Sequence, residues 1–517
     1  MSARGVVAAG HPLTAEAGAT VLREGGNAVD AAIAAVLTSF VTESPLTGLG
    51  AGGFMLVHDG ERPVVLDFFV AVPGLDGAVR SSELVPIPVY FTPGNAQTFH
   101  IGAASCGVPG TPAGLVAAAE RFGSVGLADL CAPAAALARD GVVVNSEQAF
   151  FLKILAPILA NYDEAAAIYA PRGVHLGTGD RFVFAELGDA LERLGAEGAE
   201  PFYRGEIATA MAAWVRERGG TLGVDDLAAY EAIEREPVAT DFCGRTLLTN
   251  PPPSSGGILI GFALALLERL GEYDTEQMVV AMEAAQAARS EDFLEGLRSE
   301  RFAERFLDPA RIAATAERIQ AGERPQPPPE PDGRLGSTTH ITAVDRNGWC
   351  ASVTCSNGTG SGILVPGTGV HVNNMLGEQD LNPYGFHRHE PGLRLPSMMS
   401  PSIVLDDGEL EAGLGSGGSN RIRSAVLQTV LRLVVDRDPV AAAVVAPRVH
   451  FEDGTVQAEP GIDEEVLRRL EARGYPVVRW DERNVFFGGV HAVARDPRTE
   501  ELRGGGDPRR GGAVALA

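Results

Sequence analysis

One junction in the sequence combines residue types that could carry out nucleophilic chemistry. Gly336-Ser337-Thr338-Thr339 follows a stretch rich in Pro, Glu and Gly and precedes alternating residues that predict a buried strand. A threonine hydroxyl needs a base to take its proton, and an N-terminal threonine carries one in its α-amino group, whose pKa is about 8. Cleavage of the bond between Ser337 and Thr338 would create both groups in one residue. An ordinary linker into a strand is the alternative interpretation.

A glycine-rich segment at residues 48–53, GLGAGG, matches the GxGxxG pattern of dinucleotide-binding loops. That fingerprint requires a strand before it and a helix after it, so that the helix N-terminus meets a pyrophosphate. Here a helix is predicted before the segment and a strand after it. We therefore expect the glycines to allow a close approach of two backbones, and we expect no cofactor.

Three histidines could act as metal ligands or as bases. His387 and His389 lie beside Glu390 in a loop rich in Gly and Pro, without the helical or Cys/His spacing of a metal site. His340 lies in a predicted strand, where histidines are more often structural. We expect a solvated loop, no metal site, and at most an orienting role for His340.

The N-terminal elements that support the junction are predicted from capping signals. Residues 14–41 predict two helices rich in small residues, with Thr14 as the first N-cap. Gly25-Gly26 should end the first helix, and Asn27 should cap the second. Such dense alanine implies close helix packing.

The rest of the chain separates into a helical part and a strand-rich part. Helices are predicted over most of 114–270 and over 275–307, with an extended segment at 246–250. Strands are predicted for the hairpin 54–58 and 64–69, then for 340–345, 349–355, 369–375, 402–407 and 488–496, with helices from Ile422 and Glu464. Segregated helices and strands favour stacked α and β layers, an α+β protein, over a doubly wound sheet.

The charge balance argues against several classes of partner. Asp and Glu number 67 against 42 Lys and Arg, which gives a net charge of −25. An acidic surface repels phosphate backbones and anionic lipids, so we expect no nucleic acid and no membrane partner. The five scattered cysteines favour neither disulfides nor a zinc site, and the N-terminal residues lack a signal-peptide pattern. We expect a cytoplasmic protein.

Ordered motifs along almost the whole chain resemble the γ-glutamyltranspeptidase family of N-terminal-nucleophile hydrolases. The upstream motifs are LREGGNAVDAAIAAV, LGAGGFMLV, GVPGTPAGL, DLAAYEAIEREPV and NPPPSSGGI. The downstream motifs are GSTTHITAVDRNG, VTCSNG, GSGILVPGTGVHVNNM, LPSMMSP and LGSGGSNRI. The resemblance runs from about Gly5 to beyond Gly489, and several motifs in the same order are far more specific than any one of them.

The resemblance implies a precursor that cuts itself between Ser337 and Thr338. The products would be a large subunit of residues 1–337, with a flexible leader at about 321–337, and a small subunit of residues 338–517. Both would remain in one intertwined four-layer αββα sandwich. A homodimer of such heterodimers is an assembly that the sequence leaves open.

The resemblance also implies roles for individual residues. Thr338 would be the nucleophile and Thr339 would assist it, while the N–H groups of Gly417 and Gly418 would form the oxyanion hole. A one-residue ambiguity in that motif allows Ser419 to replace one of these glycines.

Four further residues resemble the family's substrate contacts. Ser356 would form a hydrogen bond near the nucleophile, and Asn357 would contact the substrate. Glu378 would hold the substrate α-amino group, and Ser397 is the first serine of a paired-serine motif.

Two departures from the family pattern affect the substrate. Phe69 stands where the family has the arginine that binds the glutamyl α-carboxylate, and Met398 replaces the second serine of the paired motif. An apolar ring cannot stabilise a carboxylate. Loss of one charge-assisted contact costs roughly 1.5 to 3 kcal/mol, or about ten- to a hundredfold in binding.

The resulting hypothesis is a self-cleaving threonine amidohydrolase or acyltransferase that splits γ-glutamyl-type amides, as in glutathione metabolism, through an acyl-enzyme on Thr338. A first alternative is an amidase or acylase for a non-glutamyl acyl group, because of Phe69. A second alternative is a homologue that binds a small molecule without turnover, which the intact Thr338-Thr339 pair argues against.

Overall fold

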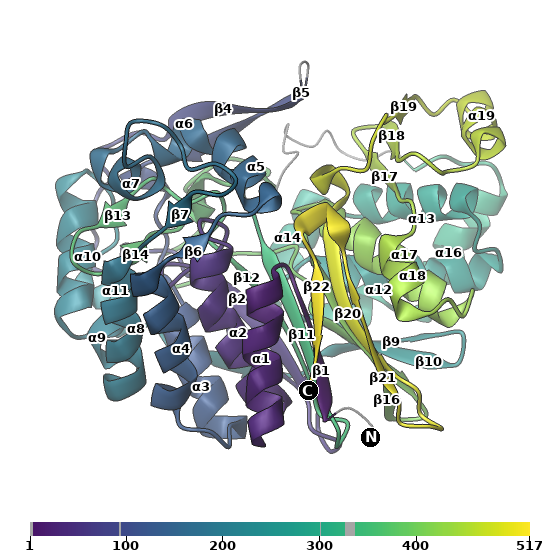
Figure 1. The fold of residues 1–517 in the computed structure, drawn as a ribbon. Helices are drawn as coiled ribbons and strands as arrows, with labels where there is room; N and C mark the ends of the chain where they lie inside the picture. The colour runs from purple at the N-terminus through teal and green to yellow at the C-terminus, as the bar shows by residue number, and fades with distance from the viewer. Residues whose placement is uncertain (1–3, 93–94, 300, 326–336) are drawn as a thin grey trace.

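Two antiparallel sheets lie face to face at the centre of the molecule, and helices cover both outer sides (Figure 1). The computed structural model describes residues 4–92, 95–299, 301–325 and 337–517. Among these residues, the first sheet has seven strands in the order β22-β1-β11-β12-β2-β3-β8, and the second has six in the order β21-β20-β16-β15-β10-β9. The four-layer αββα arrangement expected from the sequence is confirmed.

The first sheet combines strands from both sides of residue 338, with the early strand β1 inserted between two late strands. The early strands are β1 (Gly5–Ala9), β2 (Gly52–His58), β3 (Val64–Phe68) and β8 (Ile233–Arg235); the late strands are β11 (Thr339–Asp345), β12 (Cys350–Ser356) and β22 (Ala513–Leu516). β1 pairs with β11 on one side and with β22 on the other. β12 pairs with both β11 and β2. The predicted hairpin of β2 and β3 is confirmed, and it adjoins strands from the far end of the sequence.

The second sheet also combines both parts of the chain. Its strands are β9 (Val238–Phe242), β10 (Arg245–Thr249), β15 (Ser402–Asp406), β16 (Glu409–Gly417), β20 (Gly489–Arg495) and β21 (Leu502–Gly506). The apolar side chains between the sheets belong to one buried cluster that includes Val6, Leu56, Val344, Leu414 and Val490. Short strands outside the two sheets are β4 (Val85–Thr92), β5 (Asn95–Ile101), β6 (Val142–Val143), β7 (Arg181–Phe182), β13 (Leu364–Val365), β14 (Val370–His371), β17 (Val449–Glu452), β18 (Thr455–Ala458) and β19 (Val477–Arg479).

The helices divide between the two outer faces (Figure 1). Those on the side of the first sheet are α1 (Pro12–Glu24), α2 (Ala28–Thr42), α3 (Thr111–Phe122), α4 (Leu127–Asp140), α5 (Ser146–Ile154), α6 (Ala156–Leu159), α7 (Asp163–Tyr169), α8 (Ala185–Glu197), α9 (Glu200–Tyr203), α10 (Glu206–Glu217) and α11 (Val224–Ala228). Those on the side of the second sheet are α12 (Gly256–Leu270), α13 (Thr275–Ala287), α14 (Glu291–Gly296), α15 (Phe302–Phe306), α16 (Pro309–Gln320), α17 (Arg421–Val434), α18 (Val440–Val445) and α19 (Glu464–Ala472). Every residue of α2 is buried, which explains its small, apolar composition.

The N-terminal caps agree with the sequence except at one position. Asn27 caps α2, since its side chain accepts hydrogen bonds from the N–H groups of residues 29 and 30. Gly25 ends α1 in the left-handed region at φ 105°. The prediction of Thr14 as an N-cap is wrong, because α1 begins at Pro12 and is capped by His11, whose Nδ1 accepts from the Leu13 N–H. Proline fits the first helical position because its missing N–H would be unpaired there.

Two predicted elements are shorter than the sequence suggested. The prediction of a single helix over 275–307 is wrong. Helix α13 ends at residue 287, and α14 begins after Ser290, whose side chain caps it. The strand expected over 369–375 is reduced to β14. Asn373 interrupts it, since its side chain donates to the carbonyls of Gly50 and Gly107.

The glycine-rich segment at 48–53 lets two backbones approach closely, as expected. A Cβ on Gly50 would lie 2.1 Å from the carbonyl oxygen of His371, and one on Gly53 would lie 2.4 Å from that of Thr354. The segment leads into β2 and does not precede a helix.

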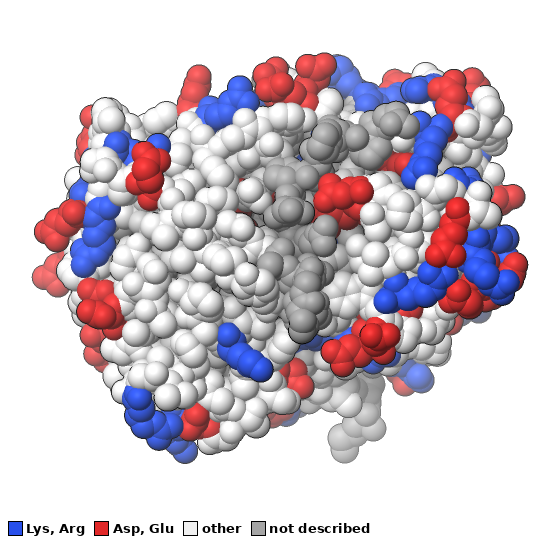
Figure 2. Space-filling model, turned by 90° about the horizontal axis from the view of Figure 1, so that it is seen from above, with Lys and Arg blue, Asp and Glu red and all other residues white. Residues whose placement is uncertain are grey.

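The segment before Thr338 is described only in part. Of the leader expected at about 321–337, residues 326–336 lie outside the described residues. In the described part of the chain, no helix is long and apolar enough to cross a bilayer. Figure 2 shows one face of the molecule, where charged side chains gather near the margins and a broad uncharged area covers much of the middle.

Candidate active site

Thr338 lies at the start of β11, next to the end of β12. It is 5% exposed, and its Oγ1 donates a hydrogen bond to Ser356 Oγ at 3.3 Å. Ser356 Oγ in turn donates to the carbonyl oxygen of Ser337 at 2.5 Å and accepts from the Gly358 N–H at 3.0 Å. The pairing of Thr339 with Cys355 brings these residues together. A single hydroxyl therefore contacts both the candidate nucleophile and the peptide carbonyl that precedes it.

A small cavity opens beside Thr338, with a volume of about 40 Å³. It brings together six of the predicted site residues: Phe69, Ser337, Thr338, Ser356, Glu378 and Ser397. Its remaining lining residues are Gly358, Met375, Asp380, Leu381, Met398, Met399, Ser419 and Ile422. We call it the acyl cavity. Its walls are mainly apolar, and none of these described lining residues is Lys, Arg or His.

Glu378 is the buried acid of the acyl cavity. Its carboxylate accepts a hydrogen bond from the Thr359 N–H at 3.3 Å. Burial raises the pKa of Glu378 to about 7, although hydrogen bonds from Asn374 and Thr359 oppose the shift. The side chain therefore changes charge near neutral pH.

Ser397 and Phe69 are held by local contacts. The Ser397 Oγ accepts from the Met399 N–H at 3.0 Å. Phe69 is 1% exposed and stacks on Phe54 at a centroid distance of 5.3 Å. Both side chains therefore form fixed walls.

Arginines do lie near position 69, but their partner is Asp67. Arg235 Nε is 2.7 Å from one oxygen of the buried Asp67 carboxylate, and Arg394 Nε is 3.5 Å from the other. Neither arginine lines the acyl cavity. They do not replace the arginine that the family pattern has at position 69.

Four predicted site residues do not line the acyl cavity. The Asn357 side chain donates to the carbonyl oxygen of His371 at 3.2 Å. Gly417 ends β16 against Thr338, where an added Cβ would lie 2.2 Å from the Thr338 carbonyl oxygen. Gly418 follows at φ 127°, and Thr339 points to the opposite side of the strand, where its hydroxyl donates to Glu43.

Ser419, which the sequence allowed as an alternative oxyanion-hole residue, lines the acyl cavity with φ 53°, a left-handed conformation that signals a constrained turn. Sequence reasoning missed two other residues near Thr338, Asp380 and Arg510. Asp380 adds a second acid, and its Oδ1 accepts from Asn420 at 3.2 Å. Behind the nucleophile, Arg510 donates to the Thr338 carbonyl oxygen at 3.1 Å. Burial lowers the pKa of Arg510 to about 10.

The histidines have structural surroundings. The buried His340 contacts the hydroxyls of Thr354 at 2.8 Å and Thr342 at 2.9 Å, and its pKa is held well below the usual value, mainly by burial. It orients neighbouring hydroxyls on the sheet. His389 contacts Arg298 at 2.7 Å, and the described residues contain no cluster of three or more potential metal ligands.

Comparison with known proteins identifies the class to which this fold and site belong. The family model described as gamma-glutamyltranspeptidase matches residues 14–517. The chain is similar to the glutathione hydrolase proenzyme of Escherichia coli (strain K12), with 32% identity over 98% of this chain and 90% of that protein. It is equally similar, at 32% identity, to the acylase ACY 1 proenzyme of Pseudomonas sp. (strain SE83), over 96% of this chain and 90% of that one.

A solved structure agrees over the full length. The cephalosporin acylase from Bacillus halodurans superposes with a TM-score of 0.83 and 25% identity, covering 99% of this chain and 96% of that one. The fold is that of the N-terminal-nucleophile hydrolases. The chain belongs to the gamma-glutamyltranspeptidase family, and it is an enzyme of the amidohydrolase and acylase type.

Proposed function

We propose that the protein is a self-cleaving N-terminal threonine amidohydrolase whose preferred acyl group is apolar and not γ-glutamyl. The observation that carries this proposal is the position of Thr338, whose hydroxyl shares the Ser356 Oγ with the carbonyl of Ser337 beside a mainly apolar cavity. Both curated relatives described above are proenzymes, which supports processing.

In the cleavage step, Thr338 Oγ attacks the carbonyl carbon of Ser337. The hydroxyl loses its proton, the carbon–nitrogen bond breaks, and the nitrogen takes up a proton to become the α-amino group of Thr338. The Ser337 acyl group is then an ester on Thr338 Oγ, and water hydrolyses it to a carboxylate. The Ser356 hydroxyl, 2.5 Å from the Ser337 oxygen, would stabilise the charge that develops there.

In turnover, the new α-amino group takes the proton of Thr338 Oγ as this oxygen attacks the substrate amide. The proton passes to the leaving amine, and the acyl group remains as an ester on Thr338. Water or a second amine then attacks the ester and releases the acyl group. Backbone N–H groups of the turn at 417–419 would hold the oxyanion. Because Ser419 lines the acyl cavity and Gly417 does not, we favour the N–H groups of Gly418 and Ser419 as the donors.

The apolar cavity favours the acylase alternative over γ-glutamyl specificity. Phe69, Met375 and Met398 line the space where a glutamyl group would need a cation or a hydroxyl for its α-carboxylate. Glu378 and Asp380 line the same space, and neither carboxyl group can replace the cation that would bind a carboxylate. The equal similarity of the chain to an acylase proenzyme and to a glutathione hydrolase proenzyme supports keeping the acylase alternative.

Two measurements test the proposal. Mass spectrometry of the purified protein should show two chains divided between residues 337 and 338, and the Thr338→Ala variant should show one. Anilides with apolar acyl groups should then react faster than γ-glutamyl anilide. An uncut wild-type chain with full amidase activity would refute the mechanism, and a clear preference for γ-glutamyl anilide would refute the acyl specificity.

A further inference from the structure

A buried carboxylate lies behind the nucleophile, on the side away from the acyl cavity. Glu43 follows the last residue of α2 and is 7% exposed. Its two oxygens accept hydrogen bonds from the hydroxyls of Thr14, at 3.1 Å, and of Thr339. A negative charge at a helix C-terminus is disfavoured by the helix dipole, and taking it out of water costs several kcal/mol. Stability alone does not explain a glutamate at this position.

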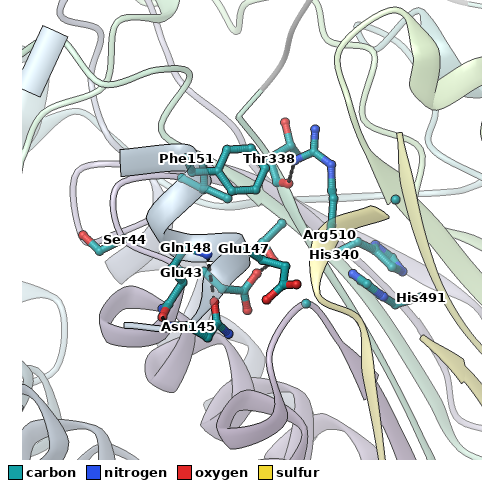
Figure 3. Close-up of a pocket in the computed structure, with 14 residues that line it drawn as sticks. Glu43, Ser44, Asn145, Glu147, Gln148, Phe151, Thr338, His340, His491 and Arg510 are labelled. Carbon is teal, nitrogen blue, oxygen red and sulfur yellow. Dashed lines mark hydrogen bonds between the residues drawn. The ribbon is translucent and has the colours of Figure 1, made fainter. Parts of the chain in front are cut away.

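Glu43 borders a second cavity, which we call the rear cavity (Figure 3). Its lining includes Glu43, Glu147, Thr338, Thr339 and Arg510. Figure 3 shows Glu43 and Glu147 on one side of this space and Arg510 reaching Thr338 on the other. Thr338 lines both the rear cavity and the acyl cavity, so the nucleophile forms part of the wall between them.

Two groups of opposite charge hold the peptide unit that follows the nucleophile. Arg510 donates to the Thr338 carbonyl oxygen at 3.1 Å, and Glu43 accepts from the Thr339 hydroxyl. Residues after Thr339 are fixed by the strand pairs of β11 on both sides. Thr338 precedes the strand, so the orientation of its backbone depends on the contacts made by Arg510 and Glu43.

We infer that Glu43 is a positioning residue for cleavage before Thr338: through the Thr339 hydroxyl, and together with Arg510, it fixes the peptide unit after Thr338 so that the Thr338 hydroxyl faces the carbonyl carbon of Ser337. The inference rests on the proposed function. Glu43 does not touch the reacting atoms and forms no covalent bond in the reaction.

The charge state of Glu43 gives this role a pH signature. Burial raises the pKa of Glu43 to about 7, while hydrogen bonds from Thr339 and Thr14 and the charge of Arg510 oppose the shift. The ionised carboxylate accepts from both hydroxyls, so correct positioning should increase as the pH rises through about 7.

The histidines and the cysteine around the rear cavity do not change charge near pH 7, and the remaining charged groups can be tested with variants of their own. Burial lowers the pKa of His11 and His491 to about 4 and that of His340 further, and it raises the pKa of Cys355 far above neutral. The charges of Arg510 and Glu147 also face the rear cavity. Glu378 titrates near 7 in the acyl cavity and therefore needs its own variant.

The test follows the cleavage of freshly synthesised precursor between about pH 6 and about pH 8, the interval around the raised pKa. Glu43→Gln and Thr339→Val should slow the appearance of the two chains by about ten- to a hundredfold, as expected for one buried hydrogen bond to a charged group. Glu43→Gln should also lose the increase with pH, which Glu378→Gln should retain. Glu147→Gln, in the same cavity, and Thr339→Ser, which keeps the hydroxyl, are matched controls that should cleave as wild type does.

Wild-type cleavage with an unchanged rate and pH profile in Glu43→Gln would overturn the inference. If Glu43→Gln fails to fold, as judged by its melting temperature, the Thr339 pair decides, and equal rates for Thr339→Val and Thr339→Ser would overturn it. If the wild-type chain is not cut, the proposed function itself fails. An affected pH profile in a folded Glu43→Gln variant supports the positioning role, because a merely structural residue would not shift it.

Discussion

Ser356 Oγ donates a hydrogen bond of 2.5 Å to the carbonyl oxygen of Ser337, and Ser356 Oγ also accepts a hydrogen bond of 3.3 Å from the hydroxyl of Thr338. The hydroxyl therefore polarises the carbonyl that the proposed cleavage attacks and holds the nucleophile beside it. Ser356 thereby links the candidate nucleophile to the peptide bond that precedes it.

Ser356→Ala should slow cleavage before Thr338 by about a hundred- to a thousandfold, because one donor to the developing oxyanion is lost. The Ser356→Thr variant keeps the hydroxyl and should cleave at nearly the wild-type rate. Gel electrophoresis of a time course after cell-free synthesis measures both rates. Equal rates for wild type and Ser356→Ala would show that the contact has no role in processing.

Phe69→Arg should shift substrate preference towards acyl groups that carry a carboxylate. A guanidinium at this wall would offer a bidentate partner and would also face the acids Glu378 and Asp380. We expect the ratio of γ-glutamyl to apolar anilide turnover, compared as kcat/KM, to rise by about tenfold or more. Phe69→Leu, which keeps the wall apolar, should leave the ratio near its wild-type value. An unchanged ratio in a folded Phe69→Arg protein would mean that position 69 does not select the acyl group.

Glu378→Gln should alter the pH dependence of stability in one direction. The folded protein raises the pKa of Glu378 from 4.5 to about 7, so the folded state binds more protons than the unfolded state between these values. The free energy of unfolding of the wild type therefore falls as the pH rises from about 4.5 to about 7, by a contribution on the order of 3 kcal/mol. The variant lacks this contribution.

Melting temperatures at pH values on either side of that interval measure the effect. The difference between Glu378→Gln and wild type should be more favourable to the variant above the interval than below it. Glu61→Gln, at an exposed position, should show no such change. If the difference from wild type is equally independent of pH for Glu378→Gln and Glu61→Gln, Glu378 is not desolvated in solution.

Gly50→Ala should destabilise the protein, whereas Gly48→Ala should not. A Cβ at Gly50 would come within 2.1 Å of the His371 carbonyl oxygen, but one at Gly48 meets no atom within 4 Å. The expected loss for Gly50→Ala is about 1 to 3 kcal/mol, as for other overpacked positions. Urea unfolding in the Thr338→Ala background, where the chain should stay in one piece, measures it. Equal midpoints for the two variants would contradict the close backbone approach.

The parts of the fold that could be predicted are those with strong local signals. The hairpin of β2 and β3 has two short, nearly continuous apolar runs separated by an Asp-Gly turn, and α2 has an Asn27 cap and a run of small apolar residues. By contrast, β16 contains three glycines, which local propensity disfavours in a strand. It forms because β15 and β20 pair with it on both sides, which no local pattern reveals.

The site shows the same limit. Thr338 and Ser356 lie in motifs that the sequence displays, and β11 and β12 bring them together. Glu43 and Arg510 reach the same peptide unit from opposite ends of the chain, so only the folded sheet makes them neighbours. Asn357 stays a predicted substrate contact, and its side-chain amide donates to the His371 carbonyl oxygen.

The interleaving of early and late strands would affect how a cleaved enzyme refolds after denaturation. β1 lies between β11 and β22, so each fragment would supply part of the other's sheet. Folding of the precursor is a reaction of one molecule, whereas renaturation of the two separated fragments would be a reaction of two and would depend on concentration. The precursor can therefore form this topology as a single chain before cleavage. After cleavage, the two fragments would stay together mainly because they cannot separate without unfolding.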